Sequence, residues 1–193
     1  MDFAQSETAK NLMRAFAGES QARNRYTFAA GEAKKQNLPV LERLFLFTAG
    51  QEKEHAEIFY NHLKALSGQT VCIDGGYPVD IDTSMAKLLQ KAHHNEFEEY
   101  QDAYPAFAAV ARKEGYGDVA RSFEMIAQIE KTHGERFLAY ANKAESDTLF
   151  KENDSAEWLC LNCGHIHKGA SAPQKCPVCD HAQGYFVQKE LKL

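Results

Sequence analysis

The sequence of 193 residues contains no long apolar run, and its longest uninterrupted one is Ala106–Ala111. A membrane-spanning helix needs about 20 predominantly apolar residues, so the sequence predicts no transmembrane segment. The N-terminal residues Met1-Asp2-Phe3 also lack the positive charge and the apolar core of a secretory signal peptide. We therefore expect a cytoplasmic protein with no membrane partner.

Basic residues are too few for a protein that binds nucleic acid through a positive surface. The chain has 22 Lys and Arg against 27 Asp and Glu, which gives a formal net charge of −5 at pH 7. This balance excludes a strongly basic nucleic-acid-binding protein. The hydrophobic fraction of 44% and the charged fraction of 25% are those of an ordinary globular protein. The length allows one or two domains.

Cysteine is almost absent from the first 145 residues, where only Cys72 occurs, whereas the other four cysteines follow residue 159. In a chain without a secretion signal, clustered thiols indicate metal ligation rather than disulfides. The change in composition near residue 146 predicts a helical domain over 1–145, a polar linker over 146–155 and a small, loop-rich domain over 156–193.

Four long helices are predicted in the first domain. Ser6 can cap the first helix, and Gly68 and Gly115 are good helix stops. The predicted helices cover about residues 6–35, 40–68 and 82–115, and a fourth follows Gly117-Asp118 and ends near Glu145. A long connection over 69–83 joins the second helix to the third, and one such crossover is the arrangement of ferritin-like bundles. Pro105 lies inside the third helix and is predicted to kink it.

The predicted inward stripe of each helix is apolar at both ends and acidic in the middle. The acids concerned are Glu19, Glu52, Glu96, Glu99 and Glu130. Burying ionised carboxylates without partners is very unfavourable, so these stripes require compensating positive charge. When residues are counted back from each hairpin loop, the acids of facing helices meet at one level. That level lies roughly 25 Å from the loop at 1.5 Å per residue.

Two Glu-x-x-His motifs lie in these stripes, at Glu52–His55 and Glu130–His133. Residues three apart on a helix share a face, so each motif presents a carboxylate and an imidazole together. With Glu19 and Glu96 from the other two helices, they form the di-metal carboxylate pattern of a helical bundle. Carboxylates with one imidazole per metal suit iron or manganese. The alternative is a solvated charged face, which the apolar ends of the stripes disfavour.

Glu99 is one carboxylate more than this minimal set. It lies three residues after Glu96 and at the same depth as Glu130, which favours a seventh ligand. The alternative is a surface acid, because the run Glu96–Glu99 is rich in charge.

The second domain contains two Cys-x-x-Cys units, at Cys160–Cys163 and Cys176–Cys179. Four thiolates suit one tetrahedral ion, either Zn²⁺ or iron. A domain of fewer than 40 residues needs a bound metal to fold, and this segment considered by itself would favour a structural zinc ion. Beside a predicted di-iron bundle, a redox-active iron is favoured, because an oxidised iron pair needs an electron source.

Together these residues resemble the rubrerythrin family over nearly the whole chain. The resemblance is carried by the segment Phe16–Tyr26, the two Glu-x-x-His motifs, Glu99 and the two cysteine pairs. It implies an all-α ferritin-like four-helix bundle with a long crossover, followed by a small rubredoxin-like domain of strands and loops. One departure is Asp180, where rubredoxins usually have glycine after the second pair. A residue other than glycine is expected to strain that turn.

The resemblance also implies the site residues. The di-iron ligands would be Glu19, Glu52, His55, Glu96, Glu99, Glu130 and His133. The catalytic residues would be these seven together with Tyr26 and Tyr104, which would lie near the irons. The cofactors would be two non-haem irons and one iron held by Cys160, Cys163, Cys176 and Cys179, with zinc as a substitute. One iron would exchange His55 for Glu99 as its oxidation state changes.

The activity implied by the resemblance is that of an NADH-peroxidase-type oxidoreductase for oxidative-stress defence, which reduces hydrogen peroxide to water. Its electrons would come from an NAD(P)H-linked reductase or from rubredoxin, through the four-cysteine site. We expect a head-to-tail homodimer or a tetramer. Two alternatives remain open: a ferroxidase or iron store, and a zinc-stapled interaction module.

Overall fold

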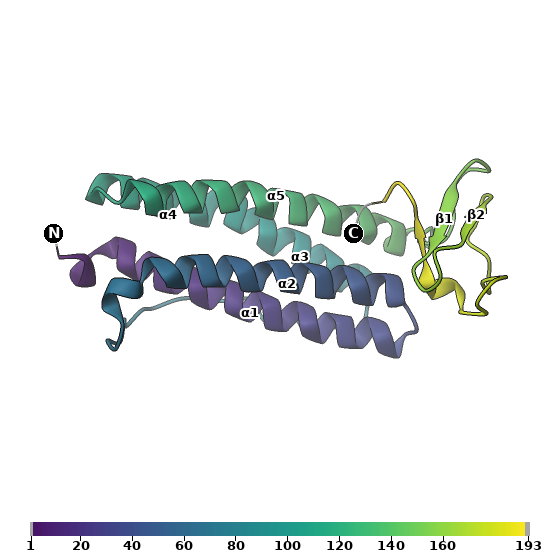
Figure 1. The fold of residues 1–193 in the computed structure, drawn as a ribbon, viewed down its shortest axis with the longest axis horizontal. Helices are drawn as coiled ribbons and strands as arrows, with labels where there is room; N and C mark the ends of the chain where they lie inside the picture. The colour runs from purple at the N-terminus through teal and green to yellow at the C-terminus, as the bar shows by residue number, and fades with distance from the viewer. Residues whose placement is uncertain (1, 192–193) are drawn as a thin grey trace.

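The computed structural model describes residues 2–191, so residue 1 and residues 192–193 of the predicted domains lie outside the described part. Long helices form an elongated bundle, and a small unit with strands lies at the end opposite the N-terminus (Figure 1). The helices of the bundle are α1 (Glu7–Lys35), α2 (Pro39–His62), α3 (Met85–Glu98), α4 (Tyr104–Glu114) and α5 (Gly117–Glu145). The strands are β1 (Glu157–Cys160), β2 (Ile166–Lys168) and β3 (Phe186–Gln188). The short helical turns are η1 (Phe3–Gln5), η2 (Lys64–Leu66), η3 (Glu99–Ala103) and η4 (Gln183–Tyr185).

The ferritin-like prediction is confirmed: α1 and α2 form one antiparallel hairpin, and α3–α4 with α5 form the other. Ser6 caps α1 by accepting a hydrogen bond from the Ala9 N–H, as predicted. The carboxylate of Glu114, at the end of α4, also accepts the N–H groups of Glu7 and Thr8. A carboxylate at a helix N-terminus is favourable, so the two hairpins are tied together at that end.

The predicted end of the second helix at residue 68 is wrong, because α2 ends at His62. The chain then tightens into η2, where the Leu66 N–H donates to the Leu63 carbonyl at 2.8 Å. This turn buries both leucine side chains in the core. Burial of apolar side chains therefore outweighs continuation of the helix.

The predicted continuous third helix is interrupted by η3, a π-helical turn that directly precedes Tyr104 and Pro105. Proline cannot donate a backbone hydrogen bond, and its ring clashes with the carbonyl four residues earlier. The wider turn accommodates this, and the Tyr104 N–H donates to the Glu99 carbonyl. The predicted kink is thus realised as one widened turn between α3 and α4, a feature frequent at functional sites.

Two apolar clusters fill the two ends of the bundle. One includes Leu41, Phe45 and Phe137, and the other includes Leu12 and Phe123. The layer between them is occupied by buried acids and histidines. The core therefore has a polar middle, as the stripes predicted.

The small unit is a three-stranded antiparallel sheet in the order β2-β1-β3. Trp158 is buried in it and donates its indole N–H to the Gly169 carbonyl at 2.9 Å. The unit packs closely on the bundle, because a Cβ at Gly184 would lie 2.2 Å from the Asn37 carbonyl oxygen. Arg43 of α2 also donates to the Leu161 carbonyl at 2.8 Å.

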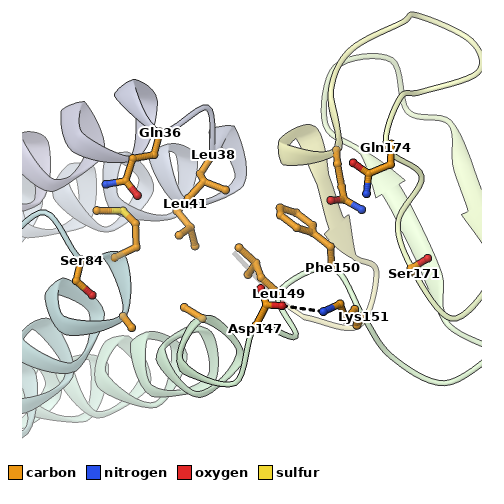
Figure 2. A pocket seen from close by; sticks show the side chains of 14 residues that line it. Gln36, Leu38, Leu41, Ser84, Asp147, Leu149, Phe150, Lys151, Ser171 and Gln174 are labelled. Carbon is orange, nitrogen blue, oxygen red and sulfur yellow. Dashed lines mark hydrogen bonds and ion pairs between the residues drawn. The ribbon is translucent and has the colours of Figure 1, made fainter.

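A cavity of about 650 Å³ lies between the end of the bundle and the small unit. Figure 2 shows Gln36, Leu38 and Leu41 on one side of it and Phe150 and Gln174 on the other. Its lining contains none of the predicted metal ligands. Its size therefore does not mark the candidate site.

None of the helices in residues 2–191 combines the length and the apolar character that crossing a bilayer requires.

Gly134 of α5 permits the closest helix packing in the bundle's middle layer. A Cβ there would lie 2.5 Å from Cδ2 of Phe97 and 3.3 Å from Cβ of Glu96. Gly134→Ala is therefore expected to destabilise the holoprotein by about 1–3 kcal/mol through overpacking. Thermal unfolding followed by circular dichroism measures this as a lower Tm.

The matched control is Gly31→Ala on α1, where a Cβ meets nothing within 4 Å. An exposed helical glycine replaced by alanine gains about 0.5–1 kcal/mol, so this Tm should rise. Equal shifts in the two variants would contradict the packing argument.

Candidate metal centres

The polar middle layer draws one or two side chains from each of four helices, α1, α2, α3 and α5. Its members are Glu19 of α1, Glu52 and His55 of α2, Glu96 of α3, and Glu130 and His133 of α5. All six are buried, and the most accessible of them, His55, is 5% exposed. The structure thus brings together the six residues of the minimal predicted set.

The ligand atoms of these residues form two overlapping groups, and within each group four atoms lie within 4.8 Å of one another. The first group comprises Glu19, Glu52, His55 and Glu130, and the second comprises Glu52, Glu96, Glu130 and His133. Glu52 and Glu130 belong to both groups. Each of these two carboxylates is therefore placed to bridge two metal ions.

The two oxygens of each shared carboxylate face different histidines. Glu130 places Oε1 2.8 Å from Nδ1 of His55 and Oε2 2.7 Å from Nδ1 of His133. Glu52 places Oε2 3.7 Å from the first of these nitrogens and Oε1 3.0 Å from the second. The two imidazole rings lie 16° from parallel, with centroids 5.6 Å apart. Each metal position thus has one imidazole, one carboxylate of its own and two shared carboxylates.

Most polar atoms of this layer are buried without a hydrogen-bond partner in residues 2–191. They include both carboxylate oxygens of Glu52 and Glu130, one oxygen each of Glu19 and Glu96, and Nδ1 of both histidines. The close carboxylate–imidazole approaches therefore lack hydrogen-bond geometry. An unsatisfied buried polar group costs about 1–3 kcal/mol, and metal ligation would satisfy all of these at once. The donor set suits iron or manganese.

The pKa shifts in this layer show its excess of negative charge. Desolvation raises the pKa of Glu19 well above its usual value, and the charges of Glu130 and Glu52 raise it further. Desolvation and then the charge of Glu52 also raise the pKa of Glu96. Burial opposes the charged form of His133, but its neighbouring carboxylates outweigh this and raise its pKa to about 12. Without metal ions, protons must supply the positive charge.

Two buried tyrosines donate hydrogen bonds into the layer. The hydroxyl of Tyr26 donates to Glu96, and the hydroxyl of Tyr104 donates to Glu19. Desolvation, followed by the charge of the accepting carboxylate, raises the pKa of each phenol well above its usual value. Both hydroxyls therefore remain protonated at neutral pH and hold one carboxylate each.

Glu99 lies outside both groups of four ligand atoms. It begins the π turn η3 and is half-buried, and its Oε1 lies 3.8 Å from where a Cβ of Gly18 would be. Desolvation and the charges of Glu96 and Glu130 raise its pKa, so it is within electrostatic reach of the layer. Its role as a seventh ligand stays a prediction.

A second set of contacts beside the layer was not predicted from the sequence. Asp80, in the crossover between α2 and α3, accepts hydrogen bonds from Arg25 and Asn95, both at 2.7 Å. These two residues directly precede Tyr26 and Glu96 in the chain. The crossover therefore supports the positions of a hydrogen-bonded pair in the layer. No local sequence signal could have shown it, because Arg25 and Asp80 are 55 residues apart.

The four predicted cysteines come together in the small unit, and their sulfurs lie within 4.8 Å of one another. The Sγ atoms of Cys160 and Cys179 are 3.7 Å apart, as are those of Cys163 and Cys176. Metal–sulfur bonds of about 2.3 Å in a tetrahedron give sulfur–sulfur edges of about 3.8 Å. A disulfide would need about 2.05 Å. The arrangement therefore fits one tetrahedral ion.

The two cysteine turns share a backbone pattern. The Gly164 N–H donates to the Cys160 carbonyl at 2.8 Å, and the Asp180 N–H donates to the Cys176 carbonyl at 3.0 Å. Gly164 has φ 78° and Asp180 has φ 61°, so both adopt the left-handed conformation. Aspartate is one of the few residues other than glycine that visits this region as a single residue. The second cysteine turn thus keeps the left-handed backbone conformation of the first, with Asp180 in the place of glycine.

The four thiols differ in their access to solvent. Cys160 and Cys176 are buried, Cys179 is half-buried and Cys163 is exposed. The backbone N–H of His181 is the largest cause that lowers the pKa of Cys179, to about 6. A thiolate is the form that ligates metal, so this side chain is prepared for ligation.

Removal of the metal ions is expected to make the bundle less stable as pH rises. In the metal-free fold, Glu19, Glu96 and His133 have raised pKa values. The folded state therefore binds more protons than the unfolded state above about pH 4.5, and the free energy of unfolding falls with pH. Chelator-treated protein should show a lower Tm at about pH 8 than at about pH 5.5.

The metal-loaded protein is the control for this measurement. Metal ions replace the protons, so its Tm should rise or stay level over the same interval. A metal-free protein at least as stable at the higher pH would contradict the assignment of raised pKa values.

Comparisons with known proteins agree with both sites. The family model described as rubrerythrin matches residues 10–141, and the one described as the rubredoxin-like domain of rubrerythrin matches residues 158–187. The rubrerythrin of Clostridium perfringens is 45% identical over 182 residues, which cover 94% of this chain and 93% of that protein. The rubrerythrin of Porphyromonas gingivalis is 42% identical over 181 residues, covering 94% and 89%.

Among solved structures, nigerythrin in its fully reduced state matches with a TM-score of 0.63 and 30% identity, covering 96% of this chain and 91% of that one. The buried carboxylate–histidine layer is thus a di-iron site, and the four cysteines form a rubredoxin-like site. This chain belongs to the rubrerythrin family.

Proposed function

We propose that this protein is a non-haem di-iron peroxidase that reduces hydrogen peroxide to water: H₂O₂ + 2 H⁺ + 2 e⁻ → 2 H₂O. The main supporting observation is that one chain holds both a two-metal carboxylate site and a four-thiol site, in two parts that pack against each other. The first suits a two-electron reaction, and the second suits the delivery of single electrons. Relatives named rubrerythrin support the same interpretation.

The residue roles follow from the two ligand groups. Glu19 and His55 would hold one iron, Glu96 and His133 would hold the other, and Glu52 and Glu130 would bridge them. Glu99 would be the seventh ligand, exchanging with His55 at one iron as the oxidation state changes. When bound, the iron pair supplies the two electrons that reduce the peroxide.

The protein supplies orientation and a dry site around this chemistry. Tyr26 and Tyr104 would keep Glu96 and Glu19 in position through their hydrogen bonds. The apolar clusters on both sides of the layer exclude water from the two flanks. A low local dielectric strengthens every electrostatic interaction in the layer.

Electrons would enter at Cys163 and Cys179, the two thiols that solvent reaches. The donor would be an NAD(P)H-linked reductase or rubredoxin, in the cytoplasm. Cys160, Cys163, Cys176 and Cys179 would hold one iron, which when bound supplies one-electron redox chemistry, and zinc would be an inactive substitute.

The small unit rests on the start of α2, and Glu52 lies 13 residues further along, about 20 Å at 1.5 Å per residue. Electron transfer falls steeply with distance, so a route within one chain is unfavourable. We therefore propose a head-to-tail homodimer, or a tetramer built from it, in which one subunit's cysteine site lies near its partner's di-iron site. A fully active monomer in sedimentation analysis would contradict this arrangement.

The division into a bundle (1–145), a linker (146–155) and a small domain (156–193) is retained as a proposal. The linker residue Phe150 packs against the bundle cluster that includes Leu41 and also against the apolar cluster of the small unit around Trp158. This packing supports a linker that holds the two parts in one orientation.

The proposed function is tested by metal analysis followed by rapid mixing. The isolated protein should contain two irons in the bundle and one in the cysteine site. After anaerobic reduction, hydrogen peroxide should restore the absorption of the four-cysteine iron faster than dioxygen does. Faster reaction with dioxygen and the accumulation of further iron would favour a ferroxidase. One zinc with no redox-active iron would favour an interaction module.

Glu130→Gln tests the shared ligand. Because Glu130 faces both histidines, the bundle should keep at most one of its two irons, while the cysteine site keeps its own. The rate of peroxide reduction should fall by more than about 100-fold, beyond the effect typical of residues that only support a ligand. Metal analysis and stopped-flow absorption measure both effects.

The control is Glu135→Gln on the same helix, whose carboxylate is 58% exposed and pairs only with Lys131 among the described residues. It should leave both metal sites unchanged. Full iron occupancy and activity in Glu130→Gln would refute the bridging role.

A further inference from the structure

A cavity of about 180 Å³ opens beside the carboxylate layer, on the side of the bundle that the crossover covers. Its walls come from α1, from the region where α3 passes through η3 into α4, and from the crossover residues 76–78. No residue of the small unit lines it. This cavity is called the crossover pocket below.

The crossover pocket ends beside the metal layer, although none of the six layer residues lines it. Glu99 and Tyr104 both line it. The hydroxyl of Tyr104 donates to Glu19, a member of the first ligand group. A molecule in the pocket therefore lies one hydrogen bond away from a ligand carboxylate. It also lies beside Glu99, which lines the pocket and belongs to neither ligand group.

Gly18 of α1 leaves open space in the pocket between Glu99 and Tyr77. A Cβ built there would lie 3.8 Å from Oε1 of Glu99 and 3.8 Å from Cε1 of Tyr77. These are ordinary van der Waals distances, so alanine would just fit and a longer side chain would fill the gap. A glycine within a helix lowers stability by about 0.5–1 kcal/mol relative to alanine. At Gly18 this loss is accompanied by open space in the pocket.

Tyr77 forms the outer wall of the pocket and is held in place. Its hydroxyl donates to the carbonyl of Arg14 at 3.0 Å. Its ring packs on Gly75, where a Cβ would lie 3.1 Å from the hydroxyl oxygen. Three residues further on, Asp80 binds Arg25 of α1 and Asn95 of α3. The crossover is therefore held to α1 and α3 beside this ring, and Tyr77 is 41% exposed to solvent.

The pocket suits a small polar molecule. Its volume equals about six times the 30 Å³ that a water molecule occupies in the liquid. The lining includes the carboxylate of Glu99, together with the amide of Gln21 and the guanidinium of Arg25, which are hydrogen-bonded to each other. Hydrogen peroxide has two O–H donors and two acceptor oxygens, which match such a lining. Gly18 and the ring of Tyr77 both line the pocket, so a bulkier alkyl hydroperoxide would have to pass between them.

We propose that the crossover pocket is the route by which hydrogen peroxide reaches the di-iron site, and that Gly18 and Tyr77 set the size of the hydroperoxide admitted. This inference rests on the proposed peroxidase function and deepens it. Gly18 and Tyr77 act here through access alone and touch no ligand atom of the two groups.

The test uses the metal-loaded full chain and three variants. Gly18→Leu fills the gap, Tyr77→Ala removes the outer wall, and Gly31→Leu is the control at an open position on the same helix, where a Cβ meets nothing within 4 Å. Fully reduced protein is mixed with hydrogen peroxide or with tert-butyl hydroperoxide, and the bimolecular rate constant of reoxidation is measured.

Gly18→Leu should lower the rate constant for hydrogen peroxide by about tenfold or more, a loss equivalent to at least about 1.4 kcal/mol of barrier. Tyr77→Ala should raise the rate constant for tert-butyl hydroperoxide relative to that for hydrogen peroxide. Gly31→Leu should change neither. Equal rate constants in Gly18→Leu and Gly31→Leu at equal iron content would overturn the inference.

A second readout separates this inference from the proposed function. The rate at which azide binds to the oxidised protein is measured by absorption and involves no peroxide chemistry. Gly18→Leu should slow azide binding, and Tyr77→Ala should speed it. If wild-type protein does not reduce peroxide but azide follows this order, the peroxidase proposal fails and the access route stands. If Gly18→Leu does not bind iron, Gly18→Ala and Tyr77→Ala still shift azide binding in opposite directions.

Discussion

The burial of four carboxylates in one layer is the constraint on which the structure depends. Glu19, Glu52, Glu96 and Glu130 lie in the middle of the bundle with two imidazoles, and several of their oxygens have no hydrogen-bond partner within residues 2–191. Such a layer is stable only when positive charge compensates it. The apolar clusters above and below position the helices so that the four carboxylates converge. Folding and metal binding are thus coupled through the same residues.

The same constraint explains the overall charge. The chain has 27 acids and 22 bases, and the five acids of the stripes account for the whole difference. The net charge of −5 is therefore a property of the candidate ligand set rather than of an acidic surface. The rest of the surface is balanced, with acids and bases in exposed pairs such as Arg112 with Glu124.

The crossover does more than connect two hairpins. Because α2 ends at one end of the bundle and α3 begins at the other, the segment between them must run along the carboxylate layer (Figure 1). There Asp80 joins Arg25 to Asn95, the residues beside Tyr26 and Glu96. The connection demanded by the topology thus also supports the hydrogen bonding of the layer and covers the pocket beside it. The small unit is similarly constrained, because the contact of Gly184 with Asn37 fixes it at the far end of the bundle.

The sequence by itself determined the fold class, the cap of the first helix at Ser6, the six members of the carboxylate layer and the four thiols. These follow from local rules: residues three apart on a helix share a face, and a Cys-x-x-Cys turn presents two sulfurs together. Only the tertiary structure decided that the third helix widens into a π turn at Glu99, that α2 stops at His62, and that Asp80 lies against Arg25. These features depend on how distant segments pack, and packing energies are not encoded in the spacing of any single segment.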